Sequence, residues 1–206
     1  MFRRKCKLIL VRHGATIYNE QNRLFDCDDY PPINQNGKIQ IENLSKWLLQ
    51  QTTHVDKIYT STALRAIQST RIISKAYDLD YETIVGLYER KAGLWGGLTF
   101  EQIENQYPDM LHLYHENPYE YWPDGGESTL DLRERVNNVI NNIIAENEYK
   151  TVIIVTHEGV IQSVIAYILG IPPENQGKIL IPTGSATQIN FYSNWATLAY
   201  CSHVTQ

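Results

Sequence analysis

Residues 8–16 constrain the fold of this chain more than any other stretch. Residues 8–11 are all apolar and partly β-branched, which is typical of a strand buried on both faces of a parallel sheet. The apolar run ends at Arg12 and His13, and Gly14 permits a sharp turn. Ligands bind at the carboxyl ends of strands in open α/β sheets, so Arg12 and His13 are predicted to lie at a binding edge. Arginine fits phosphate oxygens, and histidine supplies a nucleophilic nitrogen or moves a proton.

The rest of the chain alternates between predicted strands and predicted helices, which indicates a mainly parallel sheet with helices on both faces. Strands are expected at residues 55–59 and 151–155, and two more at 186–192 and 197–201, joined through Asn194. One helix is expected from Asn34 or Asn36 to residue 51, and a second over 63–76 with an N-cap from residues 60–62. Three more are expected: one that starts near Thr99, one that follows residues 125–128, and one over 160–169. A chain of 206 residues favours one domain, spanning 1–206.

Composition limits the possible partners. A formal net charge of −5 argues against nucleic acid, whose backbone needs a clustered positive face, but not against a small anionic ligand in a locally positive pocket. No segment reaches the length of a transmembrane helix, and the apolar run at residues 8–11 is too short for a signal peptide. Cys6, Cys27 and Cys201 lack metal-site spacing and are expected as reduced thiols. We therefore expect a cytoplasmic protein, either monomeric or homodimeric, with no membrane partner.

Two clusters could be mistaken for metal sites. Asp26, Asp28 and Asp29 lack the glycine and the distal glutamate of a calcium loop, so we expect a solvated loop there. His112 and His115 could share a helix face within the tyrosine-rich residues 107–123, but the sequence offers no third ligand. We expect residues 107–123 to fold as short helices over the mouth of the binding pocket.

Several residues capable of phosphate chemistry converge on the edge that begins at Arg12 and His13. His157 also follows a predicted buried strand, and Arg65 lies in the first turn of the helix after another. These positions share one edge of a doubly wound sheet. Arginines neutralise phosphoryl oxygens, an unprotonated histidine can attack phosphorus, and Glu89 could protonate the departing oxygen and later activate water. No metal would be required beside so much fixed positive charge.

The chain resembles the histidine phosphatase superfamily, the group of phosphoglycerate mutase-like proteins, over nearly its whole length. The motifs stand in the family's order at residues 10–16 with Asn19, 32–37 with Gln40, 60–66, 87–89 with Gly93, Trp95 and 97–99, 125–128, and 155–157. The resemblance implies a three-layer α/β/α sandwich around a mainly parallel sheet, in agreement with the order of elements above.

The resemblance also implies a role for each matching position. His13 corresponds to the nucleophile that becomes phosphorylated, and Glu89 to the proton donor and later base. The residues that correspond to the phosphate pocket are Arg12, Arg65 and His157, with Asn19 assisting them. Ser61 is expected to support the site without contacting phosphate. We expect no cofactor and no metal at the site.

The chain departs from the family pattern at three places. Many relatives have glycine after the second histidine, where this chain has Glu158. A Glu158 carboxylate in the pocket would oppose phosphate, so we expect a solvent-facing side chain. Residues 24–26 replace a frequent Gln-Gly, which puts substrate contacts from that loop in doubt. Gly96 replaces a frequent glutamate, a change expected to leave the chemistry intact.

Three functions follow as hypotheses. The first is a phosphatase that hydrolyses small soluble phosphomonoesters through a phosphohistidine on His13, without metal. The second is a cofactor-dependent phosphoglycerate mutase; family mutases carry a long basic insertion, whereas residues 98–125 contain neither lysine nor arginine. The third is a non-enzymatic protein that binds a phosphorylated ligand. Sugar phosphates, phosphoserine, nucleotides, phosphoglycerates and the phosphorylated nucleoside of cobalamin assembly all remain open as substrates, and the aromatic residues 107–122 favour one with a ring or an apolar part.

Overall fold

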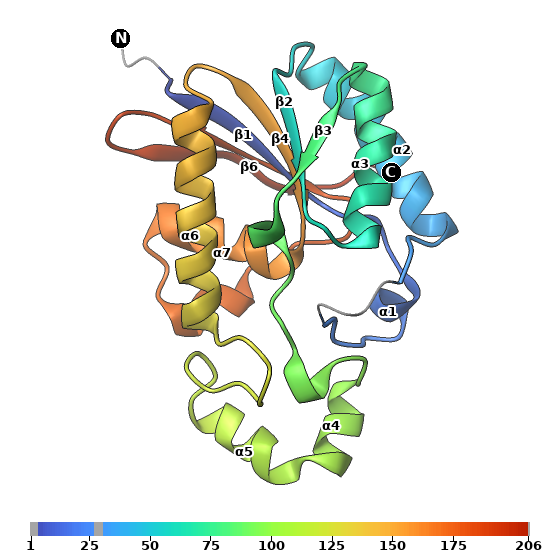
Figure 1. Cartoon of the computed structure of the whole chain (residues 1–206), viewed down its shortest axis with the longest axis vertical. Coiled ribbons are helices and arrows are strands. Elements are labelled where there is room, and N and C mark those ends of the chain that lie inside the picture. Colours follow the sequence, from blue (N-terminus) through green and yellow to red (C-terminus); the bar gives the residue numbers. More distant parts are fainter. Residues whose placement is uncertain (1–3, 27–30, 206) are drawn as a thin grey trace.

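A six-stranded sheet forms the centre of the computed structural model, which describes residues 4–26 and 31–205 (Figure 1). The strand order is β3-β2-β4-β1-β5-β6. The strands are β1 (Cys6–Arg12), β2 (Lys57–Thr60), β3 (Tyr81–Thr83), β4 (Thr151–Thr156), β5 (Ala186–Phe191) and β6 (Ala196–His203). β1 to β4 run parallel, whereas β5 is antiparallel to β1 and to β6. The prediction of a mainly parallel sheet is confirmed.

Helices cover both faces of the sheet, which makes the three layers (Figure 1). α2 (Gln35–Gln51) and α3 (Leu64–Tyr77) pack on one face against side chains such as Ile9 and Val155. α6 (Thr129–Glu146) and α7 (Glu158–Leu169) pack on the other against Leu8 and Ile154. Alternate residues of the buried strands thus pack into two separate cores. Each fully buried leucine or isoleucine contributes about 1.5–3 kcal/mol to the free energy of unfolding.

A smaller layer lies beyond the carboxyl ends of the strands (Figure 1). It contains α4 (Phe100–Gln106) and α5 (Pro108–Glu116) and has its own core around the fully buried Trp95. Four shorter elements complete the description: α1 (Ile17–Glu20) and the 3₁₀ turns η1 (Val85–Leu87), η2 (Gly93–Trp95) and η3 (Pro173–Lys178).

Most predicted helix starts are confirmed by side-chain caps. Asn34 accepts a hydrogen bond from the Gly37 amide, and Thr99 and Ser128 form capping boxes at α4 and α6. The predicted cap of α3 from residues 60–62 is wrong: Ala63 is the N-cap and makes no side-chain cap bond. The Ser61 hydroxyl lies beside His157 and accepts from the amide of Ala63 itself at 3.3 Å, not from an amide within the first turn of α3. The helix over 160–169 also begins earlier, at Glu158.

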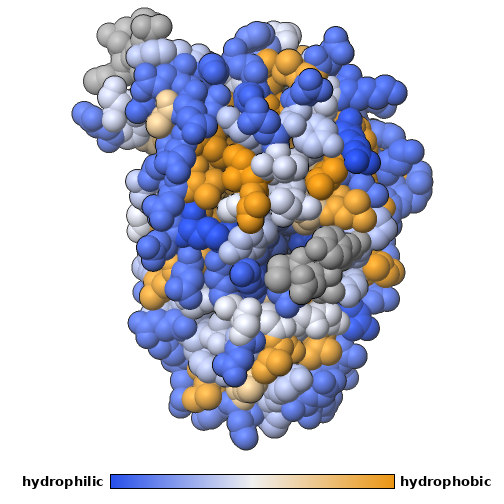
Figure 2. All heavy atoms as spheres, in the orientation of Figure 1, coloured by the Kyte–Doolittle hydropathy of each residue, from blue (hydrophilic) through white to orange (hydrophobic). Residues whose placement is uncertain are grey.

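The surface is mixed in character. Figure 2 shows mainly hydrophilic side chains on one face, with scattered hydrophobic groups and a hollow between the sheet and the α4–α5 layer. Within residues 4–26 and 31–205, no helix is both long and apolar enough to cross a bilayer. Cys6 is buried and Cys201 is exposed, both as free thiols; Cys27 lies outside the described residues.

Candidate active site

Parallel strand register brings the predicted residues to one edge of the sheet. Arg12, the last residue of β1, pairs with Thr156, the last residue of β4, and the Ser61 amide donates to the carbonyl of Val155. The residues that follow the three strands therefore meet at their carboxyl ends. Gly14 lies so close to Gly37 that an added Cβ would stand 2.3 Å from the Gly37 carbonyl oxygen, so the turn after His13 requires glycine.

His13 is fully buried, and its hydrogen bonding defines its tautomer. Nδ1 lies 2.9 Å from the Gly14 carbonyl oxygen, which can only accept, so Nδ1 carries the proton. Nε2 is buried and has no hydrogen-bond partner among the described residues. Burial first, and then the charges of Arg65 and Arg12, lower the pKa of His13 well below 6.5. The result is a neutral imidazole whose Nε2 lone pair is available at pH 7.

His157 lies beside His13 but is held differently. The two ring centroids are 5.2 Å apart, and His157 Nε2 is 2.7 Å from the Ser61 hydroxyl oxygen. Burial and the nearby Arg65 lower the pKa of His157 well below 6.5 as well. Ser61 thus contacts His157, as expected of a supporting residue.

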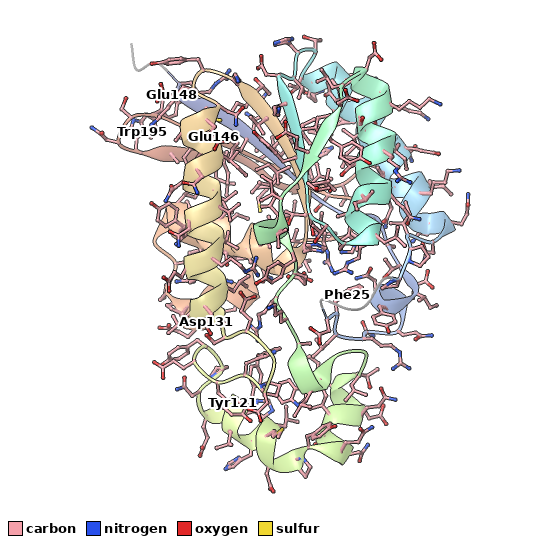
Figure 3. The ribbon with its side chains drawn as sticks, viewed as in Figure 1. Phe25, Tyr121, Asp131, Glu146, Glu148 and Trp195 are labelled. Atoms are coloured by element: carbon pink, nitrogen blue, oxygen red, sulfur yellow. The ribbon has the colours of Figure 1, made fainter. Side chains whose placement is uncertain are left out.

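Arg65 is buried in the first turn of α3, as predicted, and lies against Phe25. Its guanidinium carbon is 3.9 Å from the centroid of the Phe25 ring, a cation–π contact. The same ring meets His13 edge-on at 5.8 Å. Figure 3 shows Phe25 between the carboxyl ends of the strands and the α4 layer. Sequence reasoning did not assign Phe25 a role, because nothing in residues 24–26 indicates that this loop folds back over Arg65.

Arg12 and Glu158 form an ion pair at the site, which corrects the expectation of a solvent-facing Glu158. Glu158 Oε2 lies 2.9 Å from Arg12 Nη1, and its side chain is only 34% exposed. Burial and the charge of Glu89 raise the pKa of Glu158, against the opposing effect of Arg12. Glu158 turns toward Arg12 because the guanidinium is a cationic partner for its carboxylate. A side chain that faced only solvent would have no such partner.

Glu89 is fixed by main-chain donors. Its Oε1 accepts from the amide of Arg90 at 2.8 Å and from that of Gly159, in the first turn of α7, at 3.2 Å. The preceding segment is tied to β4 because the Thr156 hydroxyl donates to the Leu87 carbonyl at 2.8 Å. Glu89 is therefore brought to the same strand ends as His13 and His157.

Asn19 lies at the rim of the site and is occupied with local structure. Its side-chain oxygen accepts from the Thr16 amide at 3.0 Å and lies 2.9 Å from the Thr16 hydroxyl. These contacts form the capping box of α1 and leave the amide nitrogen of Asn19 for a ligand.

Two cavities adjoin the cluster, of about 820 Å³ and about 270 Å³. Glu89 borders both, Arg12 the larger and Arg65 the smaller. The larger has aromatic and aliphatic walls, which include Tyr18, Phe25, Phe100, Tyr114, Trp122 and Leu180. Tyr114 and Trp122 come from residues 107–123, as predicted for the pocket mouth. Leu180 and Thr183 belong to no motif, and no sequence pattern signals their place at the cavity.

The clusters considered as metal sites do not converge with other ligands in the part of the chain that is described. There, no three His, Cys, Asp or Glu side chains gather in a metal-like group. His112 is exposed and pairs with Glu116 at 3.5 Å. Asp28 and Asp29 lie outside the described residues.

Fold and site together define an α/β protein in which two buried histidines and two arginines meet at the carboxyl ends of the parallel strands. Residues 8–202 match the model of the histidine phosphatase superfamily (branch 1), and the chain belongs to this family. The predicted resemblance is confirmed.

Relatives with known names include phosphatases. The chain is 28% identical to phosphoserine phosphatase 1 of Hydrogenobacter thermophilus over 165 residues, covering 80% of this chain and 77% of that protein. It is 28% identical to fructose-2,6-bisphosphatase of Saccharomyces cerevisiae over 173 residues, covering 84% of this chain but only 36% of that protein. The structure of Bacillus stearothermophilus YhfR superimposes with a TM-score of 0.88 at 26% identity, over 97% of this chain and 98% of that one.

Because His13 and His157 are buried, we expect the free energy of unfolding to fall in acid. In the unfolded chain each takes up a proton near pH 6.5, whereas in the folded protein its pKa lies well below that. The unfolded state therefore binds more protons below pH 6.5, and the free energy of unfolding should fall by about 1.4 kcal/mol per pH unit for each histidine. Urea unfolding between pH 7.5 and 5 checks this. The double variant His13→Asn/His157→Asn should show a shallower slope, and an equal slope would contradict the assignment.

Proposed function

We propose that the protein is a phosphatase that hydrolyses small phosphomonoesters through a phosphohistidine on His13. The observation that carries the proposal is the state of His13: a neutral ring whose Nδ1 proton is bound by the Gly14 carbonyl, leaving Nε2 without a partner among the described residues. Arg12 and Arg65 flank it, and their charge both depresses its pKa and attracts a phosphoryl group.

The reaction runs in two steps. His13 Nε2 attacks phosphorus, the bond from phosphorus to the ester oxygen breaks, and Glu89 gives its proton to the departing oxygen. Water then attacks the phosphohistidine, Glu89 takes a proton from it, and inorganic phosphate leaves with the imidazole regenerated. Arg12, Arg65 and His157 stabilise the charge on the phosphoryl oxygens in both steps, and Asn19 assists at the rim. These residues suffice for the transfer without a metal.

The cavity supports a substrate with an apolar or ring-shaped part. About 820 Å³ with walls such as Phe100, Trp122 and Leu180 is ample for a metabolite beyond its phosphate. Phosphoserine, the substrate in the name of one relative, would fill only a small part of it.

The absence of lysine and arginine from residues 98–125 favours hydrolysis over the mutase reaction. A mutase must keep water from its phosphohistidine and hold a substrate carboxylate, and no cation of this segment is available to do so. The presence of both a nucleophile and an acid favours an enzyme over a phospho-ligand-binding protein.

Phosphate release from nitrophenyl phosphate in the presence of a chelator tests the proposal, beside an aliphatic ester and phosphoglycerate. We expect metal-independent turnover of the aryl ester, faster than of the aliphatic one, and free phosphate from phosphoglycerate. Conversion of phosphoglycerate to its isomer would support the mutase instead. Phosphate binding without turnover of any ester would indicate a binding protein, and equal rates on aryl and aliphatic esters would remove the reason for an aryl preference.

A further inference from the structure

Glu158 places a carboxylate at the wall of the large cavity. It is the first residue of α7, directly after His157, and it borders the large cavity together with Arg12 and Gln162. Its carboxylate lies 2.9 Å from Arg12 Nη1, and the same nitrogen donates to the Ile181 carbonyl oxygen. Both hydrogens of Nη1 are thereby used.

The remaining edge of the Arg12 guanidinium is the one that phosphate can use. Arg12 Nε is buried and has no hydrogen-bond partner among the described residues, so the fork formed by Nε and Nη2 can take two phosphate oxygens while Nη1 stays with Glu158. The carboxylate therefore lies beside the phosphate position rather than in it. Because Glu158 borders the large cavity and contacts Arg12, it lies close to a substrate that extends from the phosphate into this cavity.

Arg23, Arg90 and Glu89 also border this cavity, and each is held by contacts of its own. Arg23 donates to the Gln21 side chain, the Gly97 carbonyl and the Gln102 side chain. The guanidinium carbon of Arg90 lies 3.3 Å from the centroid of the Trp122 ring, and Arg90 donates to the Thr129 hydroxyl. Thr129 borders a neighbouring cavity of about 140 Å³ and not the large one. Arg12 and Arg65 serve the phosphate. Glu158 is the acidic side chain at this cavity that pairs directly with Arg12 and so lies beside the proposed phosphate position.

We propose that Glu158 sets the charge selectivity of the enzyme, favouring phosphomonoesters with an ammonium group close to the ester oxygen over those with a carboxylate or a second phosphate there. The inference rests on the proposed phosphatase function. A half-buried carboxylate attracts a nearby cation and repels a nearby anion more strongly than an exposed one, because less water screens it. The large cavity thus combines apolar walls with a carboxylate, that of Glu158, in addition to the proposed acid Glu89.

The test uses three esters of equal length that differ in terminal charge: aminoethyl phosphate, hydroxyethyl phosphate and phosphoglycolate. In the wild type, kcat/KM is expected to fall in that order. In Glu158→Gln, which keeps an oxygen acceptor for Arg12, the ratio of kcat/KM between the ammonium and carboxylate esters should fall about tenfold. Glu158→Asp should keep part of the preference, and Glu174→Gln, an exposed acid outside this cavity, should leave the ratio unchanged.

The outcomes separate this inference from the proposed function. If nitrophenyl phosphate is hydrolysed in a His13-dependent way but the ratio is the same in Glu158→Gln, the phosphatase stands and the role of Glu158 is wrong. If no ester is hydrolysed, the phosphatase proposal fails, and calorimetric binding of the three esters to His13→Ala and to His13→Ala/Glu158→Gln gives the ratio without turnover. An equal binding ratio in the two variants would likewise overturn the selectivity.

Discussion

His13→Ala is expected to abolish hydrolysis while phosphate binding persists. Loss of the nucleophile should lower the rate of phosphate release by at least about a thousandfold, because the proposed covalent intermediate forms on the His13 ring. Arg12 and Arg65 remain in the variant, so inorganic phosphate should still raise its thermal stability. Acid-quench trapping with a radiolabelled ester provides the direct measurement: the wild type should carry a phosphoryl group on His13 that is stable to base and labile to acid.

His157→Ala is the matched control, since it also removes a buried imidazole from the site. Among the described residues, His157 is engaged at Nε2 by the Ser61 hydroxyl at 2.7 Å and has no partner at Nδ1, whereas His13 is engaged at Nδ1 and has no partner at Nε2. The His157 variant should therefore react slowly but still become labelled on His13. Equal turnover in wild type and His13→Ala, or a label on His157, would show that the nucleophile is assigned to the wrong ring.

The sequence predicted the centre of the site because that centre is defined by strand ends. Apolar runs locate β1 and β4, and a parallel arrangement brings the residues after them, His13 and His157, to one edge whatever the loops do. Arg65 followed from the same rule, since it lies in the first turn after β2. Glu89 belongs to an irregular segment, so its carboxyl chemistry and the resemblance to a family pointed to it, and no strand end did.

The walls of the cavity could not be predicted, because they come mainly from loops and not from strand ends. Phe25 and Leu180 lie in loops whose course depends on tertiary contacts, such as the stacking of Phe25 on Arg65. Glu158 was recognised as unusual, but its direction depends on a pairing with Arg12 that local sequence does not encode. Side chains on regular elements follow periodicity, whereas those that line a pocket from loops follow the contacts that the whole fold makes available.

Glu89→Gln should make the rate depend on the leaving group. An alkoxide leaves poorly unless protonated, so kcat/KM for an alkyl phosphate is expected to fall about 10²–10⁴-fold in the variant. Nitrophenolate leaves without protonation, so kcat/KM for nitrophenyl phosphate, which reports the first transfer, should fall about tenfold at most. Glutamine keeps an oxygen that can accept from the Arg90 and Gly159 amides, so the local structure should be retained.

The second step gives an independent signature of the same residue. Glu89 also activates the water that attacks the phosphohistidine, so the variant should release nitrophenol in a burst and then slow down as phosphoenzyme accumulates. A series of aryl and alkyl phosphates should give a steep dependence of kcat/KM on leaving-group pKa in Glu89→Gln and a shallow one in the wild type. An equal loss on all esters without a burst would contradict both roles. Glu158, the other acidic side chain among the described residues at the large cavity, would then be the acid to replace next.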